Sequence, residues 1–204
     1  MYIPSRNKVT DVAQISDLIR TYPFGILVTS RDNKPIGTHL PFLLSGSAEP
    51  GGMLLSHMAK ANPQWRIAEG DVLVVFNGPH AYISSSWYEQ NDGVPTWNYA
   101  AVHVYGTLRL FDDPEASLQL LKETIATFDS TLVPMWEDPK HLAYFQRQAR
   151  GVVGFEIAIT SVEAKWKMSQ NRSEEDRRRV VEALLNQRTD EEPHKVAKMI
   201  KGNE

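Results

Sequence analysis

Segments typical of β-strands follow one another at short intervals through most of this chain, and they constrain its fold more than any other feature. Apolar or alternating stretches occupy residues 24–30, 36–44, 53–57, 71–77, 80–84, 99–111, 152–160 and 162–168. A few helical segments interrupt them, without the strict strand–helix alternation of a doubly wound sheet. The sequence therefore predicts a mainly β protein of the α+β class, built as a closed or partly closed antiparallel barrel with peripheral helices.

The stretch 99–111 is the clearest strand. Val102, Val104, Leu108 and Leu110 share one parity, and His103, Tyr105, Thr107 and Arg109 share the other. We expect the apolar set to face the core. Residues 36–44 and 24–30 flank a turn-rich segment and read as a hairpin.

Helix boundaries are marked by capping residues. Thr10 and Asp11 precede a short apolar helical pattern, and Asp113-Pro114 and Asp138-Pro139 each place a capping acid before a proline. Ser173 precedes three acidic residues and an apolar stripe, which predicts a first tail helix, and a second follows the break at 188–193. We expect a barrel domain over residues 1–170 and a helical extension over 171–204.

Composition excludes several classes of protein. The chain has 204 residues, 42% of them hydrophobic, and no cysteine, so disulfide scaffolds, thiolate metal sites and cysteine nucleophiles are excluded. The formal charge of −3 does not favour a general nucleic-acid binder. No apolar run approaches the length of a membrane span, and we expect a cytoplasmic protein that does not insert into membranes. Common dinucleotide, triphosphate, zincin and hydrolase motifs are also absent.

Five local clusters stand out from this background. They are T-H-L-P at 38–41, S-H-M-A-K-A-N-P-Q-W at 56–65, G-P-H-A-Y-I-S at 78–84, V-P-T-W-N-Y at 94–99 and K-M-S-Q-N-R at 167–172. At these residues the sequence resembles the PaiB family of FMN-binding negative transcriptional regulators, which belongs to the FMN-binding split barrels. The resemblance covers about residues 1–187 and departs from the family pattern at Ser85, where we expect proline.

The resemblance implies FMN as the cofactor, and the second cluster has the chemistry for its phosphate. We expect Ser56 and His57 to end a strand and a helical turn to follow, so that hydroxyl, imidazole, backbone amides and the Lys60 ammonium converge on one anion. The alternative is that Ser56 only caps the turn and Lys60 is solvated. Thr38 and His39 have opposite parity on their strand, so at most one of them faces the ligand through its side chain. We favour Thr38 for a phosphate or ribityl contact, although the family resemblance gives His39 equal prominence as a cofactor-binding residue.

The remaining candidates lie on the long strand and after the last strand. Trp97 or Tyr99 would cover the flavin ring while Asn98 bonds its edge. Donors suited to phosphate or ring carbonyls follow at Lys167, Ser169, Gln170 and Arg172, unless this run is only a surface turn before a helix. The histidines at 39, 57, 80 and 103 have no metal-ligand spacing, so we expect no metal site.

The family resemblance implies a homodimer with flavin between the subunits and repression linked to protease synthesis and sporulation. Rival hypotheses are a flavin-dependent oxidoreductase and a dimeric module with a degenerate site. We assign no catalytic residue, because bound flavin needs mainly orientation and electrostatics from a protein. DNA binding through the tail is possible, but residues 173–204 hold seven basic and eight acidic residues, which favours a packing helix over a DNA reader.

Overall fold

The structure, a computed structural model, describes residues 1–90, 93–111, 113–136, 138–186 and 191–202. These residues form two compact units. The first contains residues 1–11, 77–102 and 163–204, and the second contains 12–76 and 103–162. Within the described residues, no helix is both long enough and apolar enough to cross a membrane.

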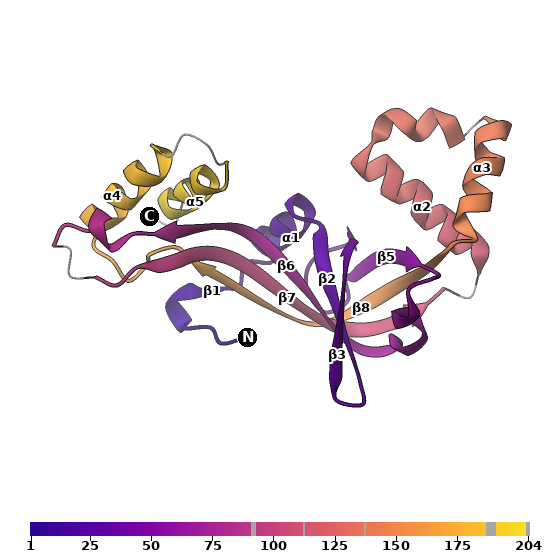
Figure 1. Cartoon of the computed structure of the whole chain (residues 1–204), viewed down its shortest axis with the longest axis horizontal. Coiled ribbons are helices and arrows are strands. Elements are labelled where there is room, and N and C mark those ends of the chain that lie inside the picture. The colour runs from indigo at the N-terminus through magenta and orange to yellow at the C-terminus, as the bar shows by residue number, and fades with distance from the viewer. Residues whose placement is uncertain (91–92, 112, 137, 187–190, 203–204) are drawn as a thin grey trace. The chain divides into compact units, whose positions relative to one another are not determined.

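The described strands form one antiparallel sheet of eight strands in the order β3-β2-β6-β7-β8-β5-β4, with β1 beside β8 (Figure 1). The strands are β1 (Lys8–Val9), β2 (Phe24–Arg31), β3 (Lys34–Pro41), β4 (Leu43–Ser45), β5 (Met53–Ala59), β6 (Gly70–Ile83), β7 (Thr96–Leu110) and β8 (Val152–Lys167). The helices are α1 (Val12–Thr21), α2 (Pro114–Phe128), α3 (Pro139–Ala149), α4 (Glu174–Leu185) and α5 (Glu191–Lys201). The expected α+β class is confirmed.

The hairpin β2–β3 forms as predicted. Its two turn residues, Asp32 and Asn33, have φ of 53° and 59°, the left-handed geometry of a tight hairpin turn. The predicted strand over 36–44, however, is broken at Phe42, whose amide donates to the Pro23 carbonyl at 2.9 Å. The Phe42 ring is buried against Phe76 and Phe155 in the core of the second unit, with centroids 5.5 and 6.4 Å away.

Two predicted strand breaks are wrong. Gly78-Pro79 does not end a strand, because β6 continues through it to Ile83. Its buried face changes parity there, from Val74 and Phe76 to Ala81 and Ile83, as happens where an irregularity interrupts a strand without ending it. The last strand pair is likewise a single strand, β8.

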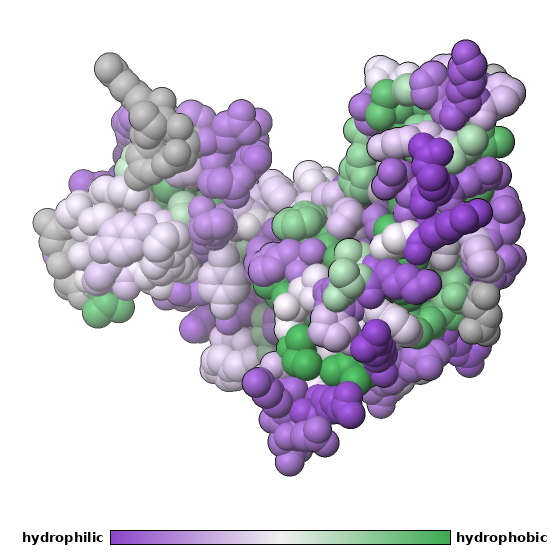
Figure 2. All heavy atoms as spheres, turned by 45° about the vertical axis from the view of Figure 1, so that its right-hand side comes forward, coloured by the Kyte–Doolittle hydropathy of each residue, from purple (hydrophilic) through white to green (hydrophobic). Residues whose placement is uncertain are grey.

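The predicted helix caps at Asp113, Asp138 and Ser173 are confirmed. Asp113 and Asp138 accept hydrogen bonds from the amides of Glu115 and Lys140, and Ser173 accepts from the amide of Asp176. In the second unit α2 and α3 are joined by a 3-10 segment, Ser130–Trp136, which the sequence did not indicate. Figure 2 shows apolar side chains among hydrophilic ones on the helical segment formed by α2, the 3-10 segment and α3, and the exposed residues of this segment include Phe128 and Leu132.

The tail helices α4 and α5 pack on each other in the first unit. Their contact buries the apolar stripe that the sequence predicts, including Val180, Leu184, Val196 and Ile200. Residues 188–190 of the predicted break between them lie outside the described residues, and residues 191–193 belong to α5, so α5 begins earlier than predicted.

Candidate functional site

The segment after β5 differs from its expected shape. Strand β5 continues to Ala59, and Lys60 and Ala61 form a turn. The helical turn begins only at Pro63, as a 3-10 segment Pro63–Ile67 with Asn62 as its cap. The expectation of a helix N-terminus directly behind His57 is therefore wrong, because the strand pairing of β5 with β8 extends to Ala59.

Ser56 and His57 occupy opposite faces of β5. Ser56 is buried, and its hydroxyl donates to the Pro41 carbonyl at 2.6 Å. His57 is half-buried on the other face. Strand alternation thus separates the two side chains, and the hydroxyl proton of Ser56 is used within the core.

His57 has a buried side-chain nitrogen that could bond a ligand. Its Nδ1 is buried and has no hydrogen-bond partner among the described residues. Burial also lowers the pKa of His57, because the charged imidazolium loses water there. A buried polar atom without a partner costs about 1–3 kcal/mol, so a ligand that bonds Nδ1 would recover that loss.

Lys60 lies three residues beyond His57, on the turn after β5. Its amide donates to the Gly151 carbonyl at 2.8 Å, and its carbonyl accepts from the Trp65 indole at 3.0 Å. These bonds fix the backbone while the side chain stays exposed. Arg66, which sequence analysis missed, lies over the Trp65 ring at 5.3 Å. Lys60 on the turn and Arg66 on the following 3-10 segment are therefore two cations suited to an anion.

On β3, Thr38 is half-buried and His39 is exposed. The Thr38 hydroxyl donates to Gln64 Oε1 and accepts from Asn62 Nδ2 at 3.0 Å. His39 stacks on the exposed ring of Phe24, with centroids 6.0 Å apart. A hydrogen bond to Asn62 thus holds Thr38 beside the turn that carries Lys60. The Thr38 hydroxyl, however, already has protein partners in Gln64 and Asn62.

The first unit holds the other candidates, and the K-M-S-Q-N-R run forms a tight turn at the end of β8. Ser169 has φ of 62°, and its hydroxyl accepts from Asn98 Nδ2 at 2.9 Å. Gln170 closes the turn, because its amide oxygen accepts from the Met168 amide at 2.7 Å and its amide nitrogen donates to the Trp166 carbonyl at 2.6 Å. Both amide ends of Gln170 therefore bond to the turn itself.

Asn98 and Trp97 face opposite sides of β7. Asn98 is fully buried, and its Oδ1 has no partner among the described residues. Trp97 is 53% exposed and contacts His80 and Tyr82, with ring centroids 6.0 Å away in both cases. Tyr99 shares the parity of Trp97, so both aromatic residues lie on the face of β7 opposite that of Asn98.

Lys167 and Lys165 share a face of β8. The Lys167 ammonium donates to the Thr96 hydroxyl, and that of Lys165 donates to the Tyr2 carbonyl at 3.2 Å. Neither lysine has a carboxylate partner within the described part of the chain. Burial lowers the pKa of Lys167, and the neighbouring Lys165 charge lowers it further.

Arg172 is stacked on the buried ring of Tyr88, with its guanidinium carbon 3.9 Å from the centroid. A small polar pocket beside it is lined by Glu89, Gln90, Asn171, Arg172, Ser173 and Asp176. The carboxylates of Glu89 and Asp176 in this lining disfavour the binding of a phosphate, because like charges repel. Tyr88 itself follows a 3-10 turn, Ser85–Trp87, in which Ser85 takes a first position that also suits proline.

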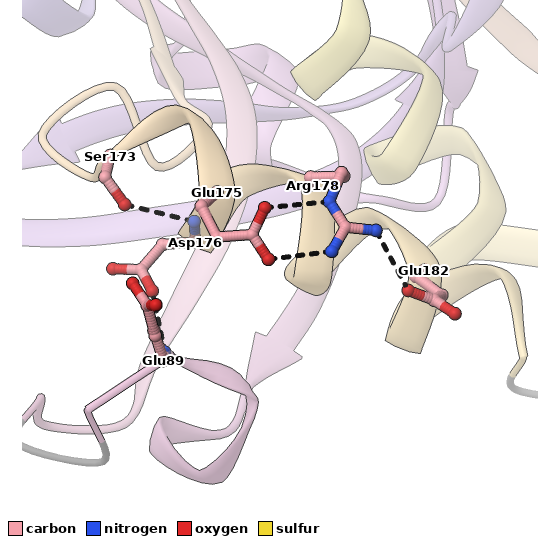
Figure 3. Close-up of polar contacts among 6 residues, drawn as sticks. All are labelled: Glu89, Ser173, Glu175, Asp176, Arg178 and Glu182. Atoms are coloured by element: carbon pink, nitrogen blue, oxygen red, sulfur yellow. Dashed lines mark hydrogen bonds and ion pairs between the residues drawn. The ribbon is translucent and has the colours of Figure 1, made fainter.

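Figure 3 shows that polar partners already surround the start of α4. The Ser173 hydroxyl accepts from the Asp176 amide, and the Asp176 carboxylate accepts from the Glu89 amide at 2.9 Å. Arg178 makes two bonds to Glu175, at 2.9 and 2.7 Å, and lies 3.6 Å from Glu182. The Asp176 amide at the start of α4 and the Arg178 guanidinium therefore already have partners in α4 and its cap residue.

Comparisons with known proteins agree with this fold. The flavocytochrome Anf3 from Azotobacter vinelandii has a TM-score of 0.61 at 16% identity, over 83% of this chain and 73% of that chain. The FAD and heme binding protein from Mycobacterium smegmatis has a TM-score of 0.60 at 17% identity, over 83% and 78%. The fold is thus an antiparallel split barrel with peripheral helices, as the sequence predicts.

Sequence comparison identifies the family. The family model described as "Putative FMN-binding domain" matches residues 1–161. Protease synthase and sporulation protein PAI 2 of Bacillus subtilis is 42% identical over 193 residues, which cover 92% of this chain and 90% of that protein. An uncharacterized protein of Emericella nidulans is 29% identical over 93% of this chain and 92% of its own length. The chain belongs to the PaiB family of FMN-binding proteins, and its cofactor is FMN.

The residues at the turn after β5 fit this cofactor. A phosphate dianion requires cations and hydrogen-bond donors, which Lys60, Arg66 and the unpartnered His57 Nδ1 can supply. Within the described residues, no group of three or more histidine and acidic side chains is placed to hold a metal ion.

Proposed function

We propose that this chain is an FMN-binding negative transcriptional regulator of the PaiB type, active as a homodimer that holds the flavin where two subunits meet. The proposal is supported by the 42% identity to a protein whose name refers to protease synthesis and sporulation. Bound FMN supplies a redox-active ring, and the chain's own residues bind and orient it. Regulation then follows the flavin state of the protein.

The proposal rests on His57 and Lys60, which lie three positions apart in the sequence. His57 Nδ1 is buried and has no partner in the described chain, while the Lys60 side chain is exposed on a turn with a fixed backbone. In our proposal Lys60 neutralises the FMN phosphate, Arg66 adds a second charge, and His57 Nδ1 bonds the ligand. Ser56 supports the strand from the core, because its hydroxyl bonds Pro41.

A homodimer is supported by an exposed aromatic cluster in the first unit. Trp97 is 53% and Tyr82 48% exposed, and the Trp97 ring contacts the rings of both His80 and Tyr82. Large aromatic side chains are enriched at protein interfaces and depleted from free surfaces. We propose that a second copy of the chain covers this cluster.

Direct DNA binding through α4 has little support. Arg178 is paired with Glu175 and Glu182, and the whole tail carries more acidic than basic residues. We therefore place regulation in the flavin site or in a protein partner.

Titration with FMN and with riboflavin, which lacks the phosphate, tests the proposal. Lys60→Ala should weaken FMN by about 1–3 kcal/mol and leave riboflavin nearly unchanged, because only FMN presents the charge that Lys60 meets. Lys34→Ala, on the β2–β3 hairpin, is the matched control and should change neither. Equal FMN affinity in Lys60→Ala and the parent protein contradicts the phosphate role. Steady turnover with reduced nicotinamide would instead favour the oxidoreductase.

A further inference from the structure

Gln64 is a buried side chain that joins both strands of the hairpin to the turn after β5. It is 1% exposed, although glutamine is seldom buried so completely. Its amide nitrogen donates to the Thr29 hydroxyl at 3.0 Å, the Ile36 carbonyl at 3.2 Å and the Leu27 carbonyl at 3.4 Å. Its amide oxygen accepts from the Thr38 hydroxyl. One side chain thus bonds to both β2 and β3.

The neighbours of Gln64 fix the orientation of its amide. The carbonyls of Leu27 and Ile36 can only accept hydrogen bonds, so the amide nitrogen must face them. The oxygen then faces Thr38, and the Thr38 hydroxyl must donate its single proton to Gln64. A hydroxyl whose proton is engaged in this way has none to offer a phosphate.

The same network holds the turn that carries Lys60. The Asn62 side chain donates from Nδ2 to the Thr38 hydroxyl at 3.0 Å, and its Oδ1 accepts from the backbone amide of Gln64 at 3.0 Å. The backbone amide of Asn62 donates to the Ala59 carbonyl at 2.9 Å, and this bond closes the turn that contains Lys60. Gln64, Thr38 and Asn62 therefore tie this turn to β3.

We infer that Gln64 is a positioning residue of the proposed phosphate site. It bonds the Thr38 hydroxyl and fixes the turn that carries Lys60. The chain therefore distinguishes FMN from riboflavin through Lys60 and not through Thr38. The inference rests on the proposed phosphate site. Gln64 acts through its neighbours and does not touch the ligand in this scheme. Its loss should therefore reduce phosphate recognition and not general flavin binding.

A double-mutant cycle tests the inference. Gln64→Met keeps the length of the side chain and removes its hydrogen bonds. Alone, it should raise the Kd for FMN by about tenfold and the Kd for riboflavin by less than about twofold. In the Lys60→Ala background, the same substitution should leave the Kd for FMN within about twofold, because the contact it positions is gone. Asn62→Ala, at a half-buried site, is a second variant with the same expected pattern should Gln64→Met fail to fold.

Ser16→Ala is the control. Ser16 is also buried in the second unit and bonds a backbone amide, that of Ala48 at 2.9 Å, so its loss should lower stability and leave both Kd values unchanged. Equal weakening of FMN and riboflavin by Gln64→Met, or an undiminished effect in the Lys60→Ala background, overturns the inference. If Lys60→Ala alone leaves FMN binding unchanged, the proposed phosphate site fails instead, so the two failures are distinguishable.

Discussion

The turn at Ser169 allows a quantitative test of whether the K-M-S-Q-N-R run serves structure. Ser169 is buried, holds a left-handed backbone with φ of 62°, and accepts the only hydrogen bond found for the Asn98 side chain within the described residues. Ser169→Ala removes that bond and leaves a buried amide donor without a partner. Because Asn98 is fully buried, we expect a loss of about 2 kcal/mol in the free energy of unfolding.

Ser169→Gly separates the hydrogen bond from the backbone strain. A left-handed conformation costs a residue with a side chain about 1–2 kcal/mol, and glycine loses about 0.4–1 kcal/mol through the greater entropy of its unfolded chain. Ser169→Gly should therefore be about 0.5–1 kcal/mol more stable than Ser169→Ala, and both should be less stable than the parent protein.

Urea denaturation followed by circular dichroism measures these differences. Riboflavin and FMN titrations of the same variants should give parental affinities, because Ser169 and Gln170 bond to the turn and its neighbours. The reasoning is refuted if Ser169→Ala is as stable as the parent protein, or if the glycine variant is the less stable of the two. Selective loss of FMN affinity would return Ser169 to the ligand contacts.

Two further predictions concern the other candidate residues. The pKa of His57 lies below its ordinary value because of burial, so as pH falls from about 7.5 to about 5.5 the unfolded chain takes up the proton first and the folded state loses stability. The parent protein should therefore lose more stability over this range than His57→Gln, and equal losses in denaturation experiments would disprove the effect. Trp97→Ser should shift the proposed homodimer towards monomer in sedimentation velocity, whereas Tyr144→Ser, at a similarly exposed aromatic on α3, should not. An unchanged dimer in Trp97→Ser rules out this contact.

Local signals account for the parts of the fold that the sequence predicts well. The caps at Asp113, Asp138 and Ser173 depend on neighbours two or three residues away, and each forms as expected. Gly78-Pro79 misled the prediction, because these residues usually end strands and here mark only a change of the buried face. The break at Phe42 depends on core packing with Phe76 and Phe155, which no local pattern reveals.

The candidate site likewise contains residues that the sequence indicates and a residue that only the fold reveals. His57 and Lys60 are recognisable from the sequence because of their residue types and spacing. Gln64 is not, since its partners Leu27, Ile36 and Thr38 lie 26 to 37 positions away in the chain and meet it only in the fold. The assignment of Ser56 as a phosphate contact likewise could not take account of the Pro41 carbonyl, which engages its hydroxyl.

A crystal structure of the FMN complex tests the central claim most directly, because it measures the distances from the phosphate oxygens to the protein. We predict a phosphate oxygen within hydrogen-bond distance of Lys60 Nζ and a ligand atom bonded to His57 Nδ1. A phosphate held by Lys165 and Lys167 of β8, with His57 Nδ1 still without a partner, would contradict the account.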